Sequence, residues 1–360
     1  MWLNDAVIWT IAVFAVVGAV DRIFGNRFGY GEQFEKGFLA MGPLALAMVG
    51  IICFSPVVAE WLRPVFIPAA NLTGADPSVF AGILFAIDMG GYPLSVELSE
   101  TDQAGLFSGI ILATMLGPTF VFTIPVALGL IKKDDHRLFA RGILIGLVPV
   151  PAGAWLAGVM AGFPTWMVLV NLVPVLVVSV FVMAGLVLFP NGMIRGFIWL
   201  GKGIVALFTI MAGVIGFEVL TGVNVVAGTS PAGEAFMIVG MIAITLSGAF
   251  PFVHFLKGIL GGVIAPVAAK LNVKRVSLVG LVSSLAHSIP VFQVLHEMDS
   301  RGKVMNVAFA VSGAFVLGGH LGFVSSVEPQ MIVPMIAGKL SAGCLAVGLA
   351  LITVKGIEES

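Results

Sequence analysis

One carboxylate stands where a charge is unfavourable. Asp88 lies within the apolar run 80–94, and two glycines and a proline follow within the next five residues. A charge at the centre of a membrane-spanning segment costs about 3 kcal/mol on insertion scales. Glycine and proline loosen the helix beside it, and the freed backbone groups can line a cavity. The stretch predicts a binding site for a small cation, with an ion pair to Lys339 or Arg141 as the structural alternative.

Other polar side chains beside helix-breaking residues are candidates for the same site. His287 and Ser288 precede Pro290, and Thr119 follows another proline. Their hydroxyl or imidazole groups can form hydrogen bonds with a ligand, and Tyr92 can assist a cation through its ring face. The structural alternative is that these groups cap a hairpin or satisfy carbonyls freed beside proline.

Two further polar residues lie deep in apolar stretches near the end of the chain. Lys339 is about ten residues into the last stretch, roughly 15 Å deep at the helical rise, so it needs a carboxylate or carbonyl partner. Because a fixed positive charge repels a cation, we expect Lys339 to form a structural or gating pair. His320, in the glycine-rich segment 317–322, is predicted with equal weight as a site member or a satisfied interior histidine.

The composition places these side chains in a membrane. Hydrophobic residues make up 59% of the 360 residues and charged residues 10%, against about 25% charged in soluble proteins. The chain is therefore predicted to be an all-α polytopic membrane protein, because a β-barrel has short alternating strands. The net charge of −1 offers no basic face to nucleic acid. Two cysteines in apolar runs predict buried thiols, not a disulfide or a metal site.

Hydropathy predicts about 9–11 transmembrane elements. Nine apolar runs are long enough to span a bilayer: 3–23, 37–60, 105–131, 138–162, 165–189, 197–220, 235–256, 303–326 and 330–354. Lysine and arginine gather in the connections 20–36, 132–141, 195–202 and 257–275, which the positive-inside rule places in the cytoplasm. The N-terminus is then expected outside and the C-terminus inside.

Two shorter apolar stretches are interrupted by polar residues and proline. The connections before and after each stretch are expected on the same side of the membrane. Each stretch must therefore return to the side from which it entered. We therefore expect two re-entrant hairpins, at about 77–96 after an interfacial stretch 61–72, and at about 276–298 from the opposite face.

The two halves of the chain resemble each other. Asp88 and His287 lie 199 residues apart, and Arg141 and Lys339 lie 198 apart. We predict a first repeat at 1–162, a linking helix at 163–196 and a second repeat at 197–360. An odd linking helix inverts the second repeat, and inverted repeats with broken elements near the midplane are typical of transporters.

Several local strings resemble the bacterial ethanolamine-utilisation permease family. They are Gly-Glu-Gln-Phe-Glu-Lys-Gly-Phe-Leu-Ala-Met-Gly at 31–42, Ala-Ile-Asp-Met-Gly-Gly-Tyr at 86–92, Met-Leu-Gly-Pro-Thr-Phe-Val-Phe-Thr-Ile-Pro-Val-Ala-Leu-Gly at 115–129, Met-Asp-Ser-Arg-Gly-Lys-Val at 298–304 and Gly-His-Leu-Gly-Phe at 319–323. The resemblance covers at least 31–345. It implies a multi-pass protein of the bacterial inner membrane that moves ethanolamine. The resemblance supplies no catalytic residues. The family pattern leads us to expect two amide side chains at the positions that His287 and Ser288 occupy in this sequence.

The residues and the resemblance agree on the kind of substrate. Ethanolamine is a small protonated amino alcohol, for which Asp88 and Tyr92 can hold the ammonium while Ser288, His287 or Thr119 holds the hydroxyl. We expect a secondary carrier or facilitator, with a channel-like pore for amines or ammonia as the alternative. An enzyme is not expected, because the five histidines are scattered and no His-x-x-x-His spacing occurs.

The expected partners are ethanolamine, membrane lipid and, as an open alternative, further copies of the chain in a homo-oligomer. No nucleic acid, cofactor or metal is expected, and the sequence holds no ATP-binding motif.

Overall fold

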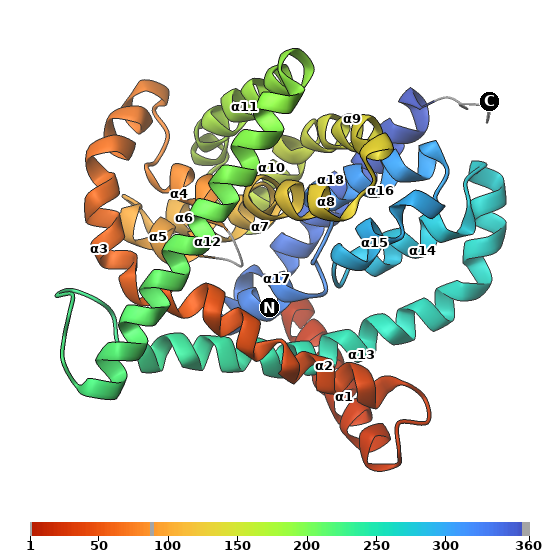
Figure 1. Cartoon of the computed structure of the whole chain (residues 1–360), viewed down its shortest axis with the longest axis horizontal. Coiled ribbons are helices and arrows are strands. Elements are labelled where there is room, and N and C mark those ends of the chain that lie inside the picture. The colour runs from red at the N-terminus through yellow and green to blue at the C-terminus, as the bar shows by residue number, and fades with distance from the viewer. Residues whose placement is uncertain (1, 87–89, 355–360) are drawn as a thin grey trace.

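The computed structural model describes residues 2–86 and 90–354 (Figure 1). Within these ranges the chain forms helices and turns and no strand. By length and composition, seven helical segments of the described residues can cross a membrane: Trp2–Ile23, Tyr30–Thr73, Lys133–Met160, Thr165–Leu188, Pro190–Thr221, Ala232–Leu271 and Pro329–Thr353. The prediction of an all-α polytopic membrane protein is confirmed at this level.

The first half of the chain alternates long helices with short ones. Its elements are α1 (Trp2–Ile23), α2 (Tyr30–Leu39), α3 (Met41–Thr73), α4 (Ser78–Leu84), α5 (Gly91–Leu98), α6 (Asp102–Leu106), the π-helical η2 (Phe107–Leu112), α7 (Ala113–Met115), the π-helical η3 (Thr119–Thr123), α8 (Ile124–Leu130), the 3₁₀ turn η4 (Lys133–Asp135), α9 (His136–Leu147) and α10 (Val150–Met160). Helix α11 (Thr165–Leu188) follows.

The second half shows the same alternation. It contains α12 (Pro190–Thr221), α13 (Ala232–Leu271), α14 (Arg275–Ser284), α15 (Ile289–Gln293), the 3₁₀ turn η5 (Leu295–Glu297), α16 (Ser300–Ser312), α17 (Gly319–Val327), the 3₁₀ turn η6 (Pro329–Met331) and α18 (Ile332–Thr353).

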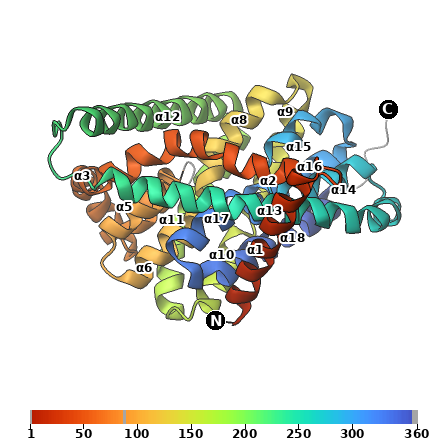
Figure 2. The same cartoon turned by 90° about the horizontal axis from the view of Figure 1, so that it is seen from below.

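Three long helices lie side by side along one side of the molecule. Figure 2 shows α12 at the edge, α3 next to it and α13 beyond. Glycines permit this close packing, because a Cβ at Gly50 would be 2.6 Å from the Phe208 carbonyl oxygen of α12. The short elements are packed against the inner side of this layer, and α7 and α17 lie near the middle of Figure 1.

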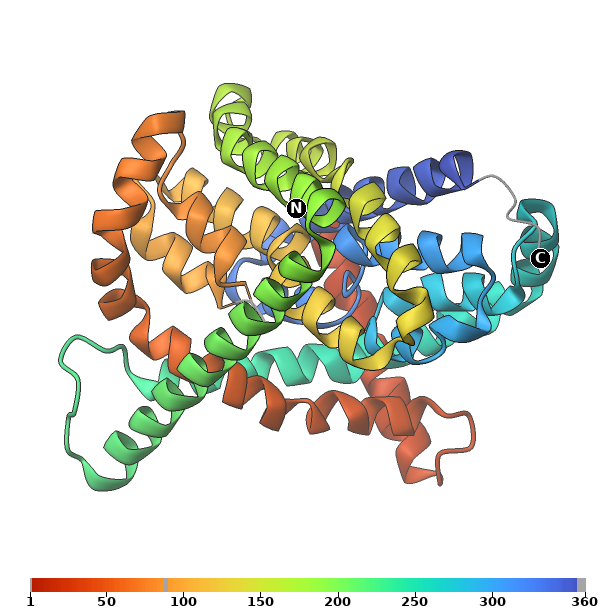
Figure 3. The ribbon, with the colours of Figure 1, turned by 45° about the horizontal axis from the view of Figure 1, so that its top comes forward.

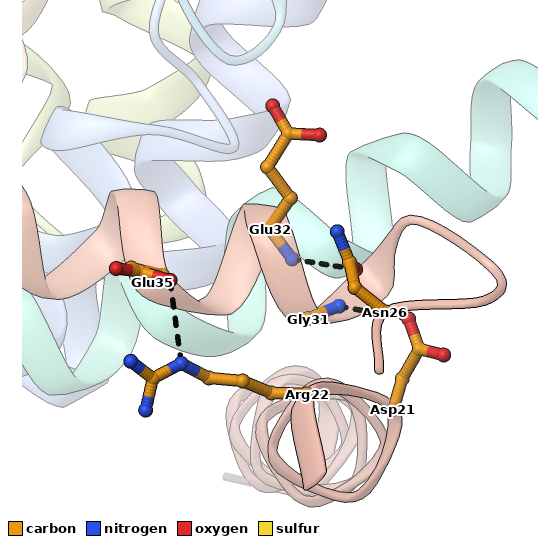
Figure 4. Close-up of polar contacts among 6 residues, drawn as sticks. All are labelled: Asp21, Arg22, Asn26, Gly31, Glu32 and Glu35. Carbon is orange, nitrogen blue, oxygen red and sulfur yellow. Dashed lines mark hydrogen bonds and ion pairs between the residues drawn. The ribbon is translucent and has the colours of Figure 1, made fainter. Parts of the chain in front are cut away.

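A buried carboxylate closes the connection between α1 and α2 (Figure 4). The Asp21 side chain accepts hydrogen bonds from the Phe28 N–H at 3.1 Å and the Gly31 N–H at 3.0 Å. The bond to Gly31 satisfies a donor in the first turn of α2, which has no partner within the helix, and the bond to Phe28 fixes the connection that precedes it. Arg22 and Glu35 form an ion pair across the connection at 3.3 Å. Asp21 therefore has a structural role in this turn.

Some predicted spans have different limits in the structure. The stretch 61–72, expected as a separate interfacial segment, belongs to α3, which continues without interruption to Thr73 despite three internal prolines. Proline removes one hydrogen bond and kinks a helix, but in membrane proteins neighbouring groups re-satisfy the freed carbonyl. Likewise α13 reaches Leu271 instead of 256, and α12 begins at Pro190 instead of 197.

The predicted spans 105–131 and 303–326 are each broken in the middle. The first is interrupted at Leu116, between α7 and η3, and the second over 313–318, between α16 and α17. Within the second break Phe315 has φ +63°, an unusual value for a bulky residue. Its N–H donates to the Ser284 carbonyl at 2.9 Å, which ties the break to the end of α14. The breaks occur where other elements supply hydrogen-bond partners.

The stretches predicted as hairpins each contain two short helices, α4 with α5 and α14 with α15. A carboxylate closes the base of each pair. Asp76 accepts from the Glu100 N–H at 2.9 Å, and Asp299 accepts from the Lys274 N–H at 2.8 Å. Both side chains also cap the following residues, since Asp76 accepts from the Ser78 N–H and Asp299 from the Gly302 N–H. Each pair is therefore fixed at the end opposite its polar interruption.

Two neighbouring glycines in the second break provide a test of this packing. A Cβ at Gly318 would overlap the Ala286 carbonyl oxygen, whereas one at Gly319 would meet nothing within 4 Å. We expect Gly318→Ala to lower the stability of the purified protein by about 1–3 kcal/mol, as overpacking does. Gly319→Ala is the control and should unfold at the wild-type temperature in a thermal unfolding assay. Equal unfolding temperatures for the two variants would contradict the tight contact.

Candidate functional site

A cavity of about 360 Å³ lies between α3, α13 and the two broken helices. Four phenylalanines and two histidines supply most of its large side chains. They are Phe122 from η3, Phe250 from α13, Phe315, Phe323 and His320 from the second break and α17, and His287 from the turn before α15. Cavities of this size, mostly apolar with a few polar groups, are the usual form of small-molecule sites.

His287 lines the cavity, and a backbone hydrogen bond sets its tautomer. Its Nδ1 accepts a hydrogen bond from the Ile289 N–H at 3.2 Å. Because a nitrogen that accepts carries no proton, this bond selects the neutral tautomer with the proton on Nε2. The ring packs edge-on against Phe315, with centroids 4.9 Å apart. A neutral imidazole can form hydrogen bonds without repelling a positively charged ligand.

His320 packs against the same phenylalanine. Its ring centroid is 5.3 Å from that of Phe315, and the residue is 6% exposed. Within the described chain its Nδ1 has no hydrogen-bond partner. Buried polar atoms are usually satisfied, so this nitrogen is suited to bind a ligand or water. The structure thus brings together two histidines that are 33 positions apart in the sequence.

The described part of the cavity lining is mostly apolar, with four phenylalanine rings and two imidazoles. It contains no carboxylate among the described residues. Aromatic faces attract ammonium groups through their quadrupole, and desolvation strengthens this attraction. The arrangement can therefore hold a small amine by ring faces while imidazole nitrogens bond to a second polar group.

Asp88 lies outside the described residues. Ala86 is the last described residue before it. Ala86 packs tightly against Gly117, where a Cβ would overlap the Ala86 side chain. Pro118, the next residue, lines the cavity. The chain therefore passes beside the cavity wall immediately before the undescribed segment.

Tyr92 is bound to a residue that the sequence analysis missed. Its hydroxyl donates to Glu328 Oε1 at 3.2 Å, and its ring packs edge-on against Phe323 at 5.4 Å. Glu328 follows α17 and also accepts a hydrogen bond from Gln330 Nε2. A signal was available, since Glu328 is an isolated acid between two long apolar runs. The contact connects α5 to the end of α17, next to a residue of the cavity wall.

Thr119 and Ser288 are fully buried and are not among the residues lining the cavity. The Thr119 hydroxyl donates to the Val311 carbonyl at 2.9 Å, near the end of α16. The Ser288 hydroxyl has no partner within the described residues. Thr119 thus joins one broken helix to the other, while Ser288 lies beside His287 with a free hydroxyl.

Lys339 has the carbonyl partner that its depth requires. The side chain is 1% exposed, and its Nζ donates to the Thr114 carbonyl at 2.5 Å. Thr114 belongs to α7, directly before the first break, where carbonyls lose their helical donors. Lys339 therefore stabilises the first break and is absent from the cavity lining.

Comparison with known proteins identifies relatives along the whole chain. The family model for the ethanolamine utilisation protein EutH matches residues 3–353. A Listeria monocytogenes protein named "Probable ethanolamine permease EutH" is 48% identical over 98% of this chain and 94% of its own length. A Salmonella typhimurium protein of the same name is 42% identical over 98% and 96%. The Bacillus subtilis protein YxeR, named as uncharacterized, is 45% identical over 97% and 95%.

No solved structure matches this chain. The family match and these identities show that the chain belongs to the EutH family of ethanolamine utilisation proteins. The names of its relatives are those of permeases and not of enzymes. Because the part of the chain that the structure describes contains seven segments able to span a bilayer, the chain is a multi-pass protein of the bacterial inner membrane.

Two threonines of η3 test the contact between the broken helices. Thr119 donates to the Val311 carbonyl, whereas the equally buried Thr123 hydroxyl has no partner in the described chain. We expect Thr119→Val to destabilise the protein by about 1–3 kcal/mol, because a buried carbonyl loses its donor. Thr123→Val should be neutral or stabilising. Thermal unfolding of both variants in the same detergent measures the difference, and an equal loss would argue against the Thr119 bond.

Proposed function

We propose that this protein moves ethanolamine across the bacterial inner membrane through the cavity between the two broken helices. The observation that carries the proposal is the joint lining by His287, His320 and four phenylalanines. Ethanolamine has one amino group, one hydroxyl and two carbons, so it needs few contacts. Ring faces suit its ammonium, and the Nε2–H of His287 suits its hydroxyl oxygen. The printed names of the relatives support the same substrate.

Asp88 is proposed to supply the negative charge for the ammonium group. The support is chemical and positional, because an acid in an apolar run is costly without a task and Ala86 lies against the Gly117–Pro118 part of the wall. Ser288 and Tyr92 are proposed as secondary contacts. His320 is proposed as a ligand-facing group, and Lys339 as the residue that stabilises or gates the first break.

We also propose that the chain consists of two inverted repeats, at 1–162 and 197–360, joined by a linker at 163–196. Helix ends at matching positions support this division. They are Ile23 and Thr221, Thr73 and Leu271, and the helix starts Asp102 and Ser300, each pair 198 residues apart. The pairs α4–α5 and α14–α15 are proposed as the re-entrant hairpins of the two repeats. Inverted repeats that meet at broken helices favour alternating access around a central site.

A carrier or facilitator is favoured over a channel-like pore for amines or ammonia. The cavity wall contains bulky side chains on every described element and specific polar atoms beside them. The Tyr92–Glu328 hydrogen bond joins the two proposed repeats at the end of α17, on the side expected to face outward. The Glu328 carboxylate there can attract protonated ethanolamine. Breaking the Tyr92–Glu328 hydrogen bond can then open a path for the substrate.

The first test removes the proposed charge. Asp88→Asn keeps the shape of the side chain, and we expect it to abolish saturable uptake of radiolabelled ethanolamine into proteoliposomes. The amount of folded protein should equal the wild type in size-exclusion chromatography. Wild-type uptake by the Asn variant would remove Asp88 from the mechanism. Uptake measured against pH and against Na⁺ then separates facilitated diffusion from ion coupling, and flux that does not saturate would favour the pore.

A second test uses two histidines from the same hairpin. His287 lines the cavity, whereas His296 is exposed and bonds to the Gln293 carbonyl at 3.1 Å. We expect His287→Leu to raise the KM for ethanolamine about tenfold, the effect of losing one hydrogen bond of about 1.4 kcal/mol. His296→Leu should transport like the wild type. A KM unchanged by His287→Leu would exclude the imidazole from substrate binding.

A further inference from the structure

A second cavity, of about 560 Å³, lies between α12, α3 and the η3–α8 segment. We call it the lateral groove and define it by Pro43, Leu46, Val126, Ile198, Lys202 and Val205. Leu46 is 57% and Val205 53% exposed. Figure 3 shows α12 in front, crossing the face of the molecule, and Figure 2 shows it at the edge. The groove therefore opens on the side of the molecule, where a membrane protein meets lipid.

Among the described residues of this mostly apolar lining, one is charged. Lys202 is on α12, and its Nζ lies 5.9 Å from the centroid of the exposed Trp199 ring. Arg195 precedes Lys202 by seven residues, close to two helical turns, so both lie on the same face of α12. Tryptophan with lysine and arginine marks the level of the lipid headgroups. The basic residues thus stand at one end of the groove, and Val205 lies further along α12.

The three walls of the groove belong to the side of the protein expected to face the cytoplasm. Helix α3 begins five residues after Lys36, and α8 ends two residues before Lys132. Basic residues at helix ends indicate the inner side of the membrane. That leaflet carries the anionic lipids, and basic pockets between transmembrane helices on this side bind their headgroups.

We propose that the lateral groove binds an anionic phospholipid of the cytoplasmic leaflet. Its phosphate is held by Lys202 and Arg195, and one acyl chain lies along Val205 between α3 and α8. An apolar groove with a cation at its end matches both parts of such a molecule. A neutral lipid lacks the negative charge that this end of the groove selects.

The bound lipid also contacts the wall of the central cavity. Phe122 and Pro43 line both cavities. An acyl chain in the groove therefore packs against residues that also form the wall of the central cavity. Binding of the lipid should therefore stabilise the folded protein whether or not ethanolamine is present. This makes the inference independent of the proposed substrate.

The test compares the full-length protein in nanodiscs of phosphatidylcholine alone and with phosphatidylglycerol. We expect phosphatidylglycerol to raise the unfolding temperature and to remain bound in native mass spectrometry. Lys202→Gln should weaken this binding about fivefold, the effect of one basic residue at an anionic surface. Lys270→Gln, an exposed residue near the end of α13, is the matched control and should bind as the wild type does. All variants should unfold at the same temperature in phosphatidylcholine.

Two further experiments identify the source of the phosphate and the role of the acyl chain of the lipid. Ala206 lines the groove, and Ala206→Phe should displace the acyl chain while leaving both charges in place, so phosphatidylglycerol binding should fall. Soluble glycerol phosphate should give no stabilisation. Equal binding of the two lipids by the wild type, wild-type binding by Lys202→Gln, or full stabilisation by glycerol phosphate would each overturn the proposal. If Ala206→Phe does not fold, the Lys202 and glycerol phosphate arms decide the outcome.

Discussion

The structure depends on one constraint, that every backbone group buried away from water must have a hydrogen-bond partner. The chain breaks two of its helices in the interior, and at each break other segments supply the missing partners. Lys339 donates to the Thr114 carbonyl at the first break. At the second break Thr119 donates to the Val311 carbonyl, and the Ser284 carbonyl accepts from the Phe315 N–H. The breaks and the elements around them therefore form one interdependent unit.

The cavity follows from these breaks. A continuous helix would bury its backbone and fill the space with regularly spaced side chains, whereas the turn at 313–318 places Phe315, Gly319 and His320 around a common space. The same turn packs Phe315 against both histidines. Carboxylates at Asp76 and Asp299 fix the short helix pairs at their opposite ends. The cavity is thus built from irregular backbone inside a frame of long helices.

Much of the frame could be predicted from the sequence, because hydropathy and charge depend on composition and order alone. The all-α membrane class and most of the apolar segments were predicted, as was the need of Lys339 for a carbonyl or carboxylate. The uninterrupted helix through three prolines in α3, the breaks at Leu116 and 313–318 and the true ends of α12 and α13 were not. Those features depend on which neighbours replace lost hydrogen bonds, and such neighbours come from distant parts of the chain.

By itself the sequence determined that this chain enters a bilayer, that it belongs to a family of ethanolamine permeases and which polar residues stand in apolar surroundings. These conclusions rest on the identity and spacing of residues. Only the tertiary structure decided that His287 and His320 share a cavity while Thr119 and Lys339 hold backbone carbonyls, and that Tyr92 meets Glu328. The physical reason is that a polar side chain in an apolar environment needs a partner, and the fold determines whether that partner is the protein's own backbone or a ligand.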